Sequence, residues 1–327
     1  MGNLNEKAQL HGSFRPCRDI LLALALIFGL STYLYGVRVL IIAAVSTVTA
    51  LLCDLLAAAL RPHTHRASDI SSYAFALTLA AMLPATVPYT TVIYSTAAAV
   101  LLGKHAFGGW DGLVFHPAAL GYAIAAVCNP TGVTSYPKPF SSIGLGFNVG
   151  DVQLYDGILK TLRLGAVPDT DIVDLALGNY AAPLGSAFGL VCAACLVLFV
   201  AHRDITWHTP VAFLAVCAAW SLISPRLSLT RLASLEYEMS AGGLFFAAAF
   251  ILSLPALAPK NRAARLASGV IAALAAILFR TSTDYELSVC FASLLTTPLA
   301  SWLDELFESI PKARRKEKSL KGGELDG

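Results

Sequence analysis

Residues 70–102 read ISSYAFALTLAAMLPATVPYTTVIYSTAAAVLL and contain no charged side chain. These 33 residues would form a helix far longer than the roughly 20 residues that cross a bilayer core. Pro84 and Pro88 cannot both lie inside one regular helix, because proline lacks an amide hydrogen and its ring clashes with the preceding turn. The stretch therefore predicts two membrane-spanning helices, Ile70–Leu83 and Tyr89–Leu102, joined by a tight turn.

Eight further apolar segments extend this pattern, so the sequence predicts about ten membrane-spanning helices. Several segments are short or interrupted by glycine or proline, as in broken helices, which lipid tolerates only where protein covers the loose backbone. The predicted fold is an all-α polytopic membrane bundle, with a five-plus-five inverted repeat as one arrangement of its spans. The eight segments are Asp19–Gly36, Arg38–Leu60, Ala118–Cys128, Leu184–Ala201, Pro210–Ser224, Glu238–Leu254, Ala264–Phe279 and Glu286–Trp302.

The composition is typical of a protein that uses lipid as its solvent. Hydrophobic residues make up 56% of the 327 residues and charged residues only 13%. Soluble domains have roughly 45–50% apolar and 25% charged residues. These values exclude a disordered chain, a nucleic-acid binder with a basic face and almost any soluble globular enzyme.

Lysine and arginine are distributed unequally between the two sides that ten spans define. Of the 23 basic residues, 16 fall on the side of the two termini. Cytoplasmic loops are enriched in these residues, so we expect both termini to lie in the cytoplasm and the bundle to lie in a bacterial cytoplasmic membrane. The predicted parts are a cytoplasmic N-terminal segment (1–18), a transmembrane bundle (19–302) with an external loop (131–183), and a basic cytoplasmic tail (303–327). The tail is either a topology anchor near anionic lipid headgroups or a docking site for a soluble partner.

Few ionisable side chains fall within or beside the spans, and Asp111 and Glu238 are the candidates for an ion path. Charges inside membrane spans are costly and often functional. Glu238 opens an apolar segment, where a helix N-terminus also favours a carboxylate, so both interpretations stay open. Cys192 and Cys195 share a helix face, either as packing residues or as a redox pair. We predict no metal site. The remaining ionisable side chains of this kind are Asp54, Asp69 and Glu286.

Five motifs follow one another along the chain: GKHAFGGWDGLVFHPAALG (103–121), LGAVP (164–168), HRDITWHTPV (202–211), YEMSAGGLFF (237–246) and YELSVCFASLLTTPLASWLDE (285–305). In this order and spacing, the chain resembles the D-type membrane component of the Rnf ion-translocating electron-transport complex. That family is similar to the B-type component of the sodium-pumping NADH:quinone reductase. The resemblance implies a membrane subunit of a larger complex that passes electrons while sodium or protons cross. It implies no catalysis by this chain alone.

The resemblance also implies FMN, attached through a phosphoester to a threonine of an external loop. The matching flavin-site positions here include Gly165, Ala166 and Val167, with Val167 in the place of the threonine. Valine resembles threonine in shape but has no hydroxyl oxygen, so the flavin-attachment motif is degenerate and covalent FMN at Val167 is excluded. A non-covalently bound flavin, or riboflavin, is the alternative.

Two other functions fit the same sequence. One is a transporter or channel of similar bundle architecture, since such proteins share ten-span counts and broken helices. The other is a scaffold subunit without redox activity. The expected partners are the lipid bilayer, sodium or protons, and the other subunits of an Rnf-like complex. Nucleic acid is not an expected partner.

Overall fold

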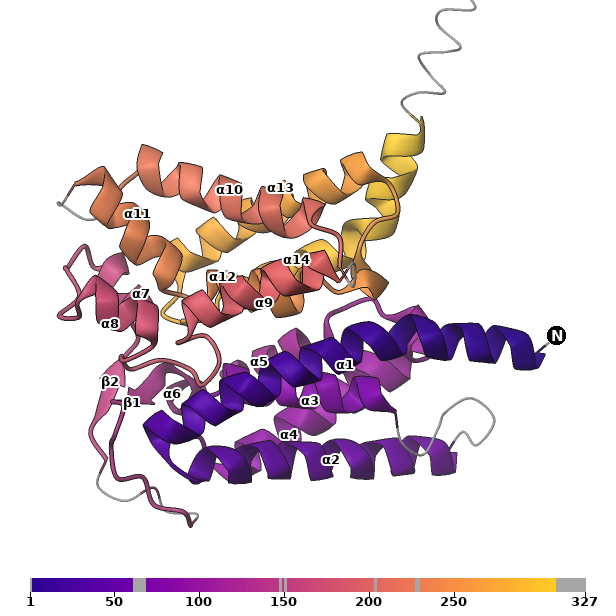
Figure 1. Cartoon of the computed structure of the whole chain (residues 1–327), viewed down its shortest axis with the longest axis horizontal. Helices are drawn as coiled ribbons and strands as arrows, with labels where there is room; N and C mark the ends of the chain where they lie inside the picture. Colours follow the sequence, from indigo (N-terminus) through magenta and orange to yellow (C-terminus); the bar gives the residue numbers. More distant parts are fainter. Residues whose placement is uncertain are drawn as a thin grey trace, which may run out of the picture.

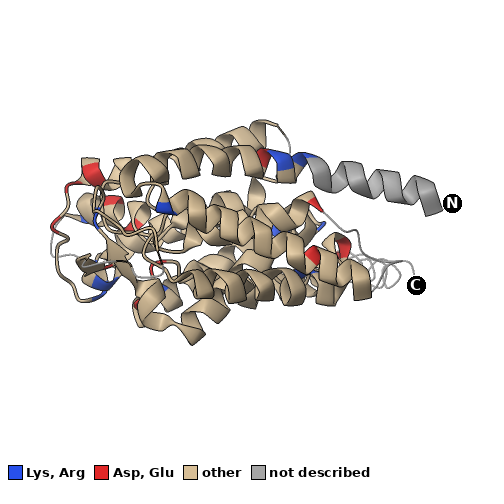
Figure 2. Cartoon of the chain, turned by 90° about the horizontal axis from the view of Figure 1, so that it is seen from below, with Lys and Arg blue, Asp and Glu red and all other residues tan. Residues whose placement is uncertain are grey.

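The computed structural model describes residues 2–60, 69–146, 149, 152–202, 205–226 and 230–309, with side chains from Arg15 onward. Its helices form an elongated bundle, and most of them run along its long axis (Figure 1). Acidic and basic residues gather mainly toward the two ends of the bundle, with other residues between them (Figure 2). This distribution agrees with an apolar middle that faces lipid.

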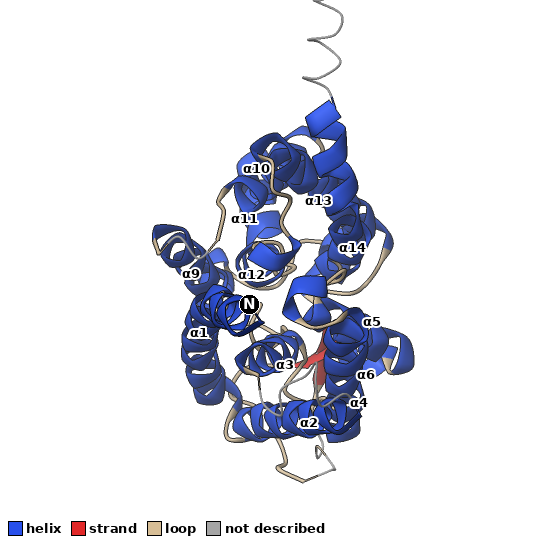
Figure 3. Ribbon diagram, turned by 90° about the vertical axis from the view of Figure 1, so that its right-hand side faces the viewer, coloured by secondary structure: helices blue, strands red, loops and turns tan. Residues whose placement is uncertain are grey.

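The first half of the bundle surrounds a short buried helix, α3. Ten of the 13 residues of α3 are buried, and α1, α2 and α5 pack around it (Figure 3). After α4 the helix widens into a π-helical segment, η1, which leads through the turns η2 and η3 to α5. The bounds are α1 (Gly2–Tyr35), α2 (Arg38–Leu60), α3 (Ile70–Met82), α4 (Tyr89–Ala98), η1 (Ala99–Lys104), η2 (His105–Phe107), η3 (Trp110–Gly112) and α5 (Pro117–Cys128).

The second half surrounds another buried segment, formed by α12 and the π-helical η4. Both elements pack against α9, and η4 also contacts α10 and α14. Residues 300–309 continue the chain as a helix beyond η6. The bounds are α9 (Gly189–Ala201), α10 (His208–Ile223), α11 (Arg231–Ser240), α12 (Leu244–Phe246), η4 (Ala247–Ile251), η5 (Pro255–Leu257), α13 (Arg262–Ser282), α14 (Val289–Thr296) and η6 (Thr297–Leu299).

The two halves repeat the same packing pattern. In the first half α1 packs on α3, α2 on α4, and α4 on α5; in the second, α9 packs on α12, α10 on α13, and α13 on α14. The halves meet where α5 contacts α14 and α1 contacts α9. Each of these two sets thus has five helices, one of which is the short central α3 or α12.

The long connection between the halves is structured. It holds a two-stranded antiparallel sheet, in which Tyr136 is paired with Tyr155. These short elements lie at the end of the bundle opposite the start of α1 (Figure 1). The expected all-α fold is therefore confirmed as mostly helical, with this small sheet added. The elements are α6 (Pro130–Thr134), β1 (Ser135–Pro137), β2 (Leu154–Asp156), α7 (Ile158–Arg163) and α8 (Ile172–Leu177).

The helical hairpin predicted from the two prolines is present. Helix α3 ends before Leu83, and α4 begins directly after Pro88. Three described helices are long and apolar enough to cross a membrane: Arg15–Tyr35, Arg38–Leu60 and Arg262–Ser282. Several others, including α3, are apolar but shorter. The protein is therefore a helical membrane protein.

Two of the predicted spans, each with glycine or proline in its sequence, are broken helices in the structure. The span Glu238–Leu254 breaks after Ser240, because Gly242 and Gly243 have φ angles of +71° and +60°. Side chains rarely tolerate this left-handed backbone, and glycine adopts it readily. The span Glu286–Trp302 changes to a 3-10 turn at Pro298, which cannot supply the amide that a regular helix needs.

A fully buried arginine ties three segments together at the loop end of the bundle. Arg38 lies at the start of α2 and is 0% exposed. Its guanidinium donates four hydrogen bonds of 2.7–3.1 Å and stacks 4.5 Å from the ring centre of Tyr89. It therefore joins α2 to the α3–α4 turn and to the connection that follows α6. The acceptors are the carbonyl oxygens of Ala85, Val87, Gly144 and Gly146.

Candidate functional site

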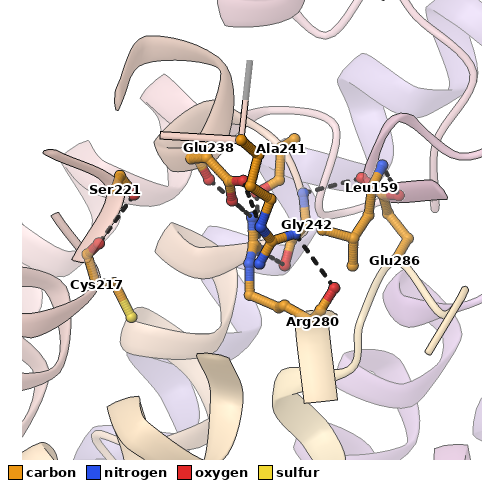
Figure 4. Close-up of polar contacts among 9 residues, drawn as sticks. Leu159, Cys217, Ser221, Glu238, Ala241, Gly242, Arg280 and Glu286 are labelled. Atoms are coloured by element: carbon orange, nitrogen blue, oxygen red, sulfur yellow. Dashed lines mark hydrogen bonds and ion pairs between the residues drawn. The ribbon is translucent and has the colours of Figure 1, made fainter. Parts of the chain in front are cut away.

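The predicted ion-path residue Glu238 belongs to a buried cluster at the break between α11 and α12 (Figure 4). Arg280, from the C-terminal end of α13, donates from Nη2 to Glu238 Oε2 at 2.8 Å and to the Glu238 carbonyl oxygen at 2.9 Å. Arg226 Nε lies 3.2 Å from the other carboxylate oxygen. The Glu238 carboxylate therefore forms ion pairs with two guanidinium groups instead of capping the N-terminus of a helix.

Glu286 completes this cluster from the start of the last helical segment. It is fully buried, and its carboxylate accepts from the amide of Gly242 at 2.9 Å and from the amide of Leu159 at 3.0 Å. Leu159 belongs to α7, so Glu286 joins the helix break to the long connection. We call Arg226, Glu238, Arg280 and Glu286 the α12 cluster.

The glycine pair explains why the cluster forms at this point. A Cβ on Gly242 would lie 2.0 Å from Nη1 of Arg280, so only glycine leaves room for the guanidinium. Nη1 also lies 3.3 Å from the carbonyl oxygen of Ala241 and 3.5 Å from that of Gly242. The guanidinium therefore supplies donors to carbonyl groups that the helix break leaves without intrahelical partners.

A second buried cluster lies at the start of α3. His105 Nε2 is 2.7 Å from Oδ1 of Asp54, and the same oxygen accepts from the Ser72 hydroxyl at 2.7 Å. Lys104 Nζ donates to Ser72 Oγ at 2.6 Å and to Asp69 Oδ2 at 2.8 Å. These five residues form the α3 cluster, in which Asp54 and Lys104 are almost fully buried.

The loop that matches the flavin site is the C-terminal cap of α7. Gly165 has a φ of +71°. Its amide donates to the carbonyl oxygen of Leu162 at 3.0 Å, and the amide of Ala166 donates to that of Thr161 at 3.1 Å. This pair of bonds is the Schellman motif, which requires a left-handed residue such as glycine after the helix. Val167 follows with 47% of its surface exposed.

The chain matches known proteins over almost its whole length. The model of the NQR2, RnfD, RnfE family matches residues 12–311. The chain belongs to this family. Its relatives include two proteins named as the D component of an ion-translocating oxidoreductase complex, one from Pseudomonas paraeruginosa (strain DSM 24068 / PA7) and one from Pseudomonas aeruginosa (strain UCBPP-PA14). The first is 29% identical, with 89% of this chain and 88% of the relative covered. The second is 31% identical, with 90% of each chain covered. A protein of the same name from Escherichia coli O9:H4 (strain HS) is 28% identical, with 86% of this chain and 91% of the relative covered.

The FMN that resemblance to the family implies does not fit the turn at Val167. Valine offers no oxygen for a phosphoester, and the nearby basic side chains already have acidic partners. In α7, Lys160 pairs with Asp156 at 2.9 Å and Arg163 with Asp284 at 2.6 Å. A phosphate group at this turn would have to compete with these carboxylates.

The two predicted ion-path residues are not brought together in this family member. Asp111 lies in η3 and is exposed, whereas Glu238 is buried in the α12 cluster. In the described part of the chain, no hydrogen bond or ion pair joins them. Cys192 and Cys195 are both buried in α9, and the Cys192 thiol lies 3.5 Å from the carbonyl oxygen of Gly185. Their surroundings agree with a packing role.

Sequence reasoning missed the partners that make both clusters. Lys104 and Arg280 were not among the candidate site residues, yet both are buried at the ends of helical segments. One signal was available: each lies next to an apolar segment and close in sequence to other ionisable residues, His105 in one case and Glu286 in the other. Charges so close to lipid require an internal partner.

Proposed function

We propose that this chain is the D-type membrane component of an Rnf-like complex that couples electron transfer to the movement of sodium or protons across a membrane. The family match carries this proposal, together with relatives named as the D component that cover 86–90% of the chain. The chain acts with other subunits of such a complex, since its relatives are named as one subunit of an ion-translocating oxidoreductase complex.

We further propose ten spans arranged as two inverted five-helix halves in a bacterial cytoplasmic membrane. The repeated packing order of the two halves supports this arrangement. The excess of basic residues on the side of the termini supports cytoplasmic termini. The long connection, including α7 and α8, would then lie outside.

Co-purification tests the membership of a complex. A full-length chain with an affinity tag, produced at its natural level and solubilised in mild detergent, is expected to bring down the other subunits in fixed stoichiometry. The same chain with Val167→Ala is the matched control and is expected to behave identically, because this small change falls on a half-exposed apolar side chain. If the chain purifies without partner subunits, and if vesicles that contain only this protein take up a solute, the result would instead indicate a transporter.

Covalent flavin is expected to be absent from this chain. Any flavin that the chain holds would be bound non-covalently and lost on denaturation. If the chain holds no flavin, electrons would pass between cofactors of neighbouring subunits. The measurement is in-gel fluorescence of the denatured complex under ultraviolet light. A relative that carries threonine at the matching position serves as the positive control. A fluorescent band at the mass of this chain would contradict the expectation.

A further inference from the structure

Three tyrosines from different segments are buried close to Glu286 of the α12 cluster. Tyr122 lies in α5, Tyr136 in β1 and Tyr180 in the stretch between α8 and α9. Their exposed fractions are 0%, 0% and 4%. None of the three hydroxyl groups has a hydrogen-bond partner in the described part of the chain. Because buried polar groups in native proteins pair with protein or with ordered water, these hydroxyls require an explanation.

The three phenols and the carboxylate belong to one site. Glu286 interacts electrostatically with each of the hydroxyl groups, and Tyr136 does so with both Tyr122 and Tyr180. A Cβ on Gly157 would collide with Oε2 of Glu286 and would lie 3.1 Å from Cε2 of Tyr136. The carboxylate and this ring therefore adjoin the same glycine. We call Tyr122, Tyr136, Tyr180 and Glu286 the tyrosine site.

Neighbouring backbone groups do not supply what the phenols lack. The amide of Leu287 lies near the Tyr122 hydroxyl, and the amide of Glu286 lies near the Tyr136 hydroxyl. A backbone N–H only donates a hydrogen bond, so it offers no acceptor for the hydrogen that the phenol itself carries. Each phenol hydrogen of the tyrosine site therefore still needs an acceptor.

Glu286 has acceptor capacity left. A carboxylate has about four lone-pair positions, and the amides of Gly242 and Leu159 occupy two of them. No phenol of the site donates to this carboxylate directly within the described ranges. The tyrosine site thus combines donors that lack acceptors with an acceptor that has free positions, and a bridging molecule can join the two.

We propose that the tyrosine site binds ordered water, which bridges the phenols to Glu286 and joins the long connection to both halves of the bundle. A water molecule can accept from a phenol and donate to the carboxylate at the same time. Buried waters typically make about three such bonds to otherwise unpaired groups.

A sodium ion fits this site less well than water. It offers the phenol hydrogens no acceptor. Arg280 and Glu238 act on Glu286 with opposite sign, so this pair adds no attraction for a cation. The inference concerns bound water and does not depend on the proposed function.

Phenylalanine variants of the full chain in detergent micelles test the proposal by the sign of their effect. Tyr122→Phe, Tyr136→Phe and Tyr180→Phe each remove one hydroxyl and keep the ring. If water pairs with the hydroxyls, each variant should lower the midpoint of thermal unfolding by about 2 °C, because a hydrogen bond is lost. If the hydroxyls are unpaired, the midpoint should stay equal or rise, because an unsatisfied buried group is removed. Two or more variants at least as stable as the wild-type chain would overturn the proposal.

Two other tyrosines of the chain are matched controls. Tyr35→Phe removes a hydroxyl that donates to the carbonyl oxygen of Tyr180 at 3.1 Å, so it should lower the midpoint by a similar amount and sets the scale for a paired hydroxyl. Tyr33→Phe changes a side chain that is 76% exposed, and it should leave the midpoint unchanged.

Two further measurements identify the bound species. The wild-type midpoint should be the same when choline replaces sodium. A midpoint that rises with sodium in the wild-type chain but not in Tyr136→Phe would overturn the proposal and indicate a cation site. An experimental structure that resolves buried waters should show density between Glu286 and at least one phenol of the site. Waters resolved elsewhere in the core, with none at the tyrosine site, would contradict the proposal.

Discussion

Arg280→Met is expected to lower the free energy of unfolding by about 3–5 kcal/mol, because removing one partner of a buried ion pair is strongly destabilising and Glu238 keeps only the longer contact with Arg226. The Arg280 side chain is only 2% exposed, and Glu238 lies 2.8 Å away. The substitution also removes the donors that reach the carbonyl oxygens of Glu238, Ala241 and Gly242. Thermal unfolding in detergent micelles, followed by tryptophan fluorescence, is the measurement.

Two further variants separate the charge from the packing. The double variant Arg280→Met with Glu238→Gln should recover part of the loss, because the carboxylate no longer stays buried without its main partner. Arg163→Met, which breaks the partly exposed pair with Asp284, should cost only about 0–1 kcal/mol. If the Arg280 and Arg163 variants lose the same free energy of unfolding, the α12 cluster contributes no more to stability than a surface ion pair.

Arg38→Met is expected to have an effect of similar size, although the four acceptors of Arg38 are backbone carbonyl oxygens rather than carboxylates. Hydrogen bonds to a charged group contribute roughly 1.5–3 kcal/mol each without being additive. We expect a loss of about 3–5 kcal/mol, the range found when a buried charged partner is removed. The same unfolding assay measures it.

Limited proteolysis should show where the Arg38 variant opens. The segment around Gly144 and Gly146 loses its contact with α2, so we expect new cleavage there before global unfolding. Arg18→Met is the matched control, because the Arg18 side chain is 54% exposed and pairs with its direct neighbour Asp19. Cleavage at unchanged rates in the Arg38 variant, with stability equal to that of the Arg18 variant, would contradict the prediction.

The sequence predicted the local features of the fold well and the long-range ones poorly. Pro84 and Pro88 act on their own backbone, so the hairpin of α3 and α4 followed from proline chemistry alone. The break within the span that begins at Glu238 was harder to predict. A glycine pair inside an apolar segment is equally compatible with close helix packing, and only the structure shows that a Cβ on Gly242 would collide with the guanidinium of Arg280.

The candidate site shows the same division. Val167 could be assessed from its side chain, since a missing hydroxyl needs no structure to recognise. The partner of Glu238 lies 42 positions away along the chain, and that of His105 lies 51 positions away. No sequence periodicity links such positions, because their separation in space depends on where α13 and η1 end relative to the central elements α12 and α3. Lys104 and Arg280 were not predicted as site residues for this reason.

The short length of α3 has a consequence for how the protein is made. Its 13 residues span about 20 Å, less than the roughly 30 Å of a hydrocarbon core. The ribosome delivers α1 and α2 first, and both are long enough to enter the membrane independently. Helix α3 is too short to do so, and we expect it to leave the translocon together with α4 and then to pack against α1 and α2, which it contacts in the structure. Biosynthesis of this protein would then proceed by pairs of helices rather than helix by helix.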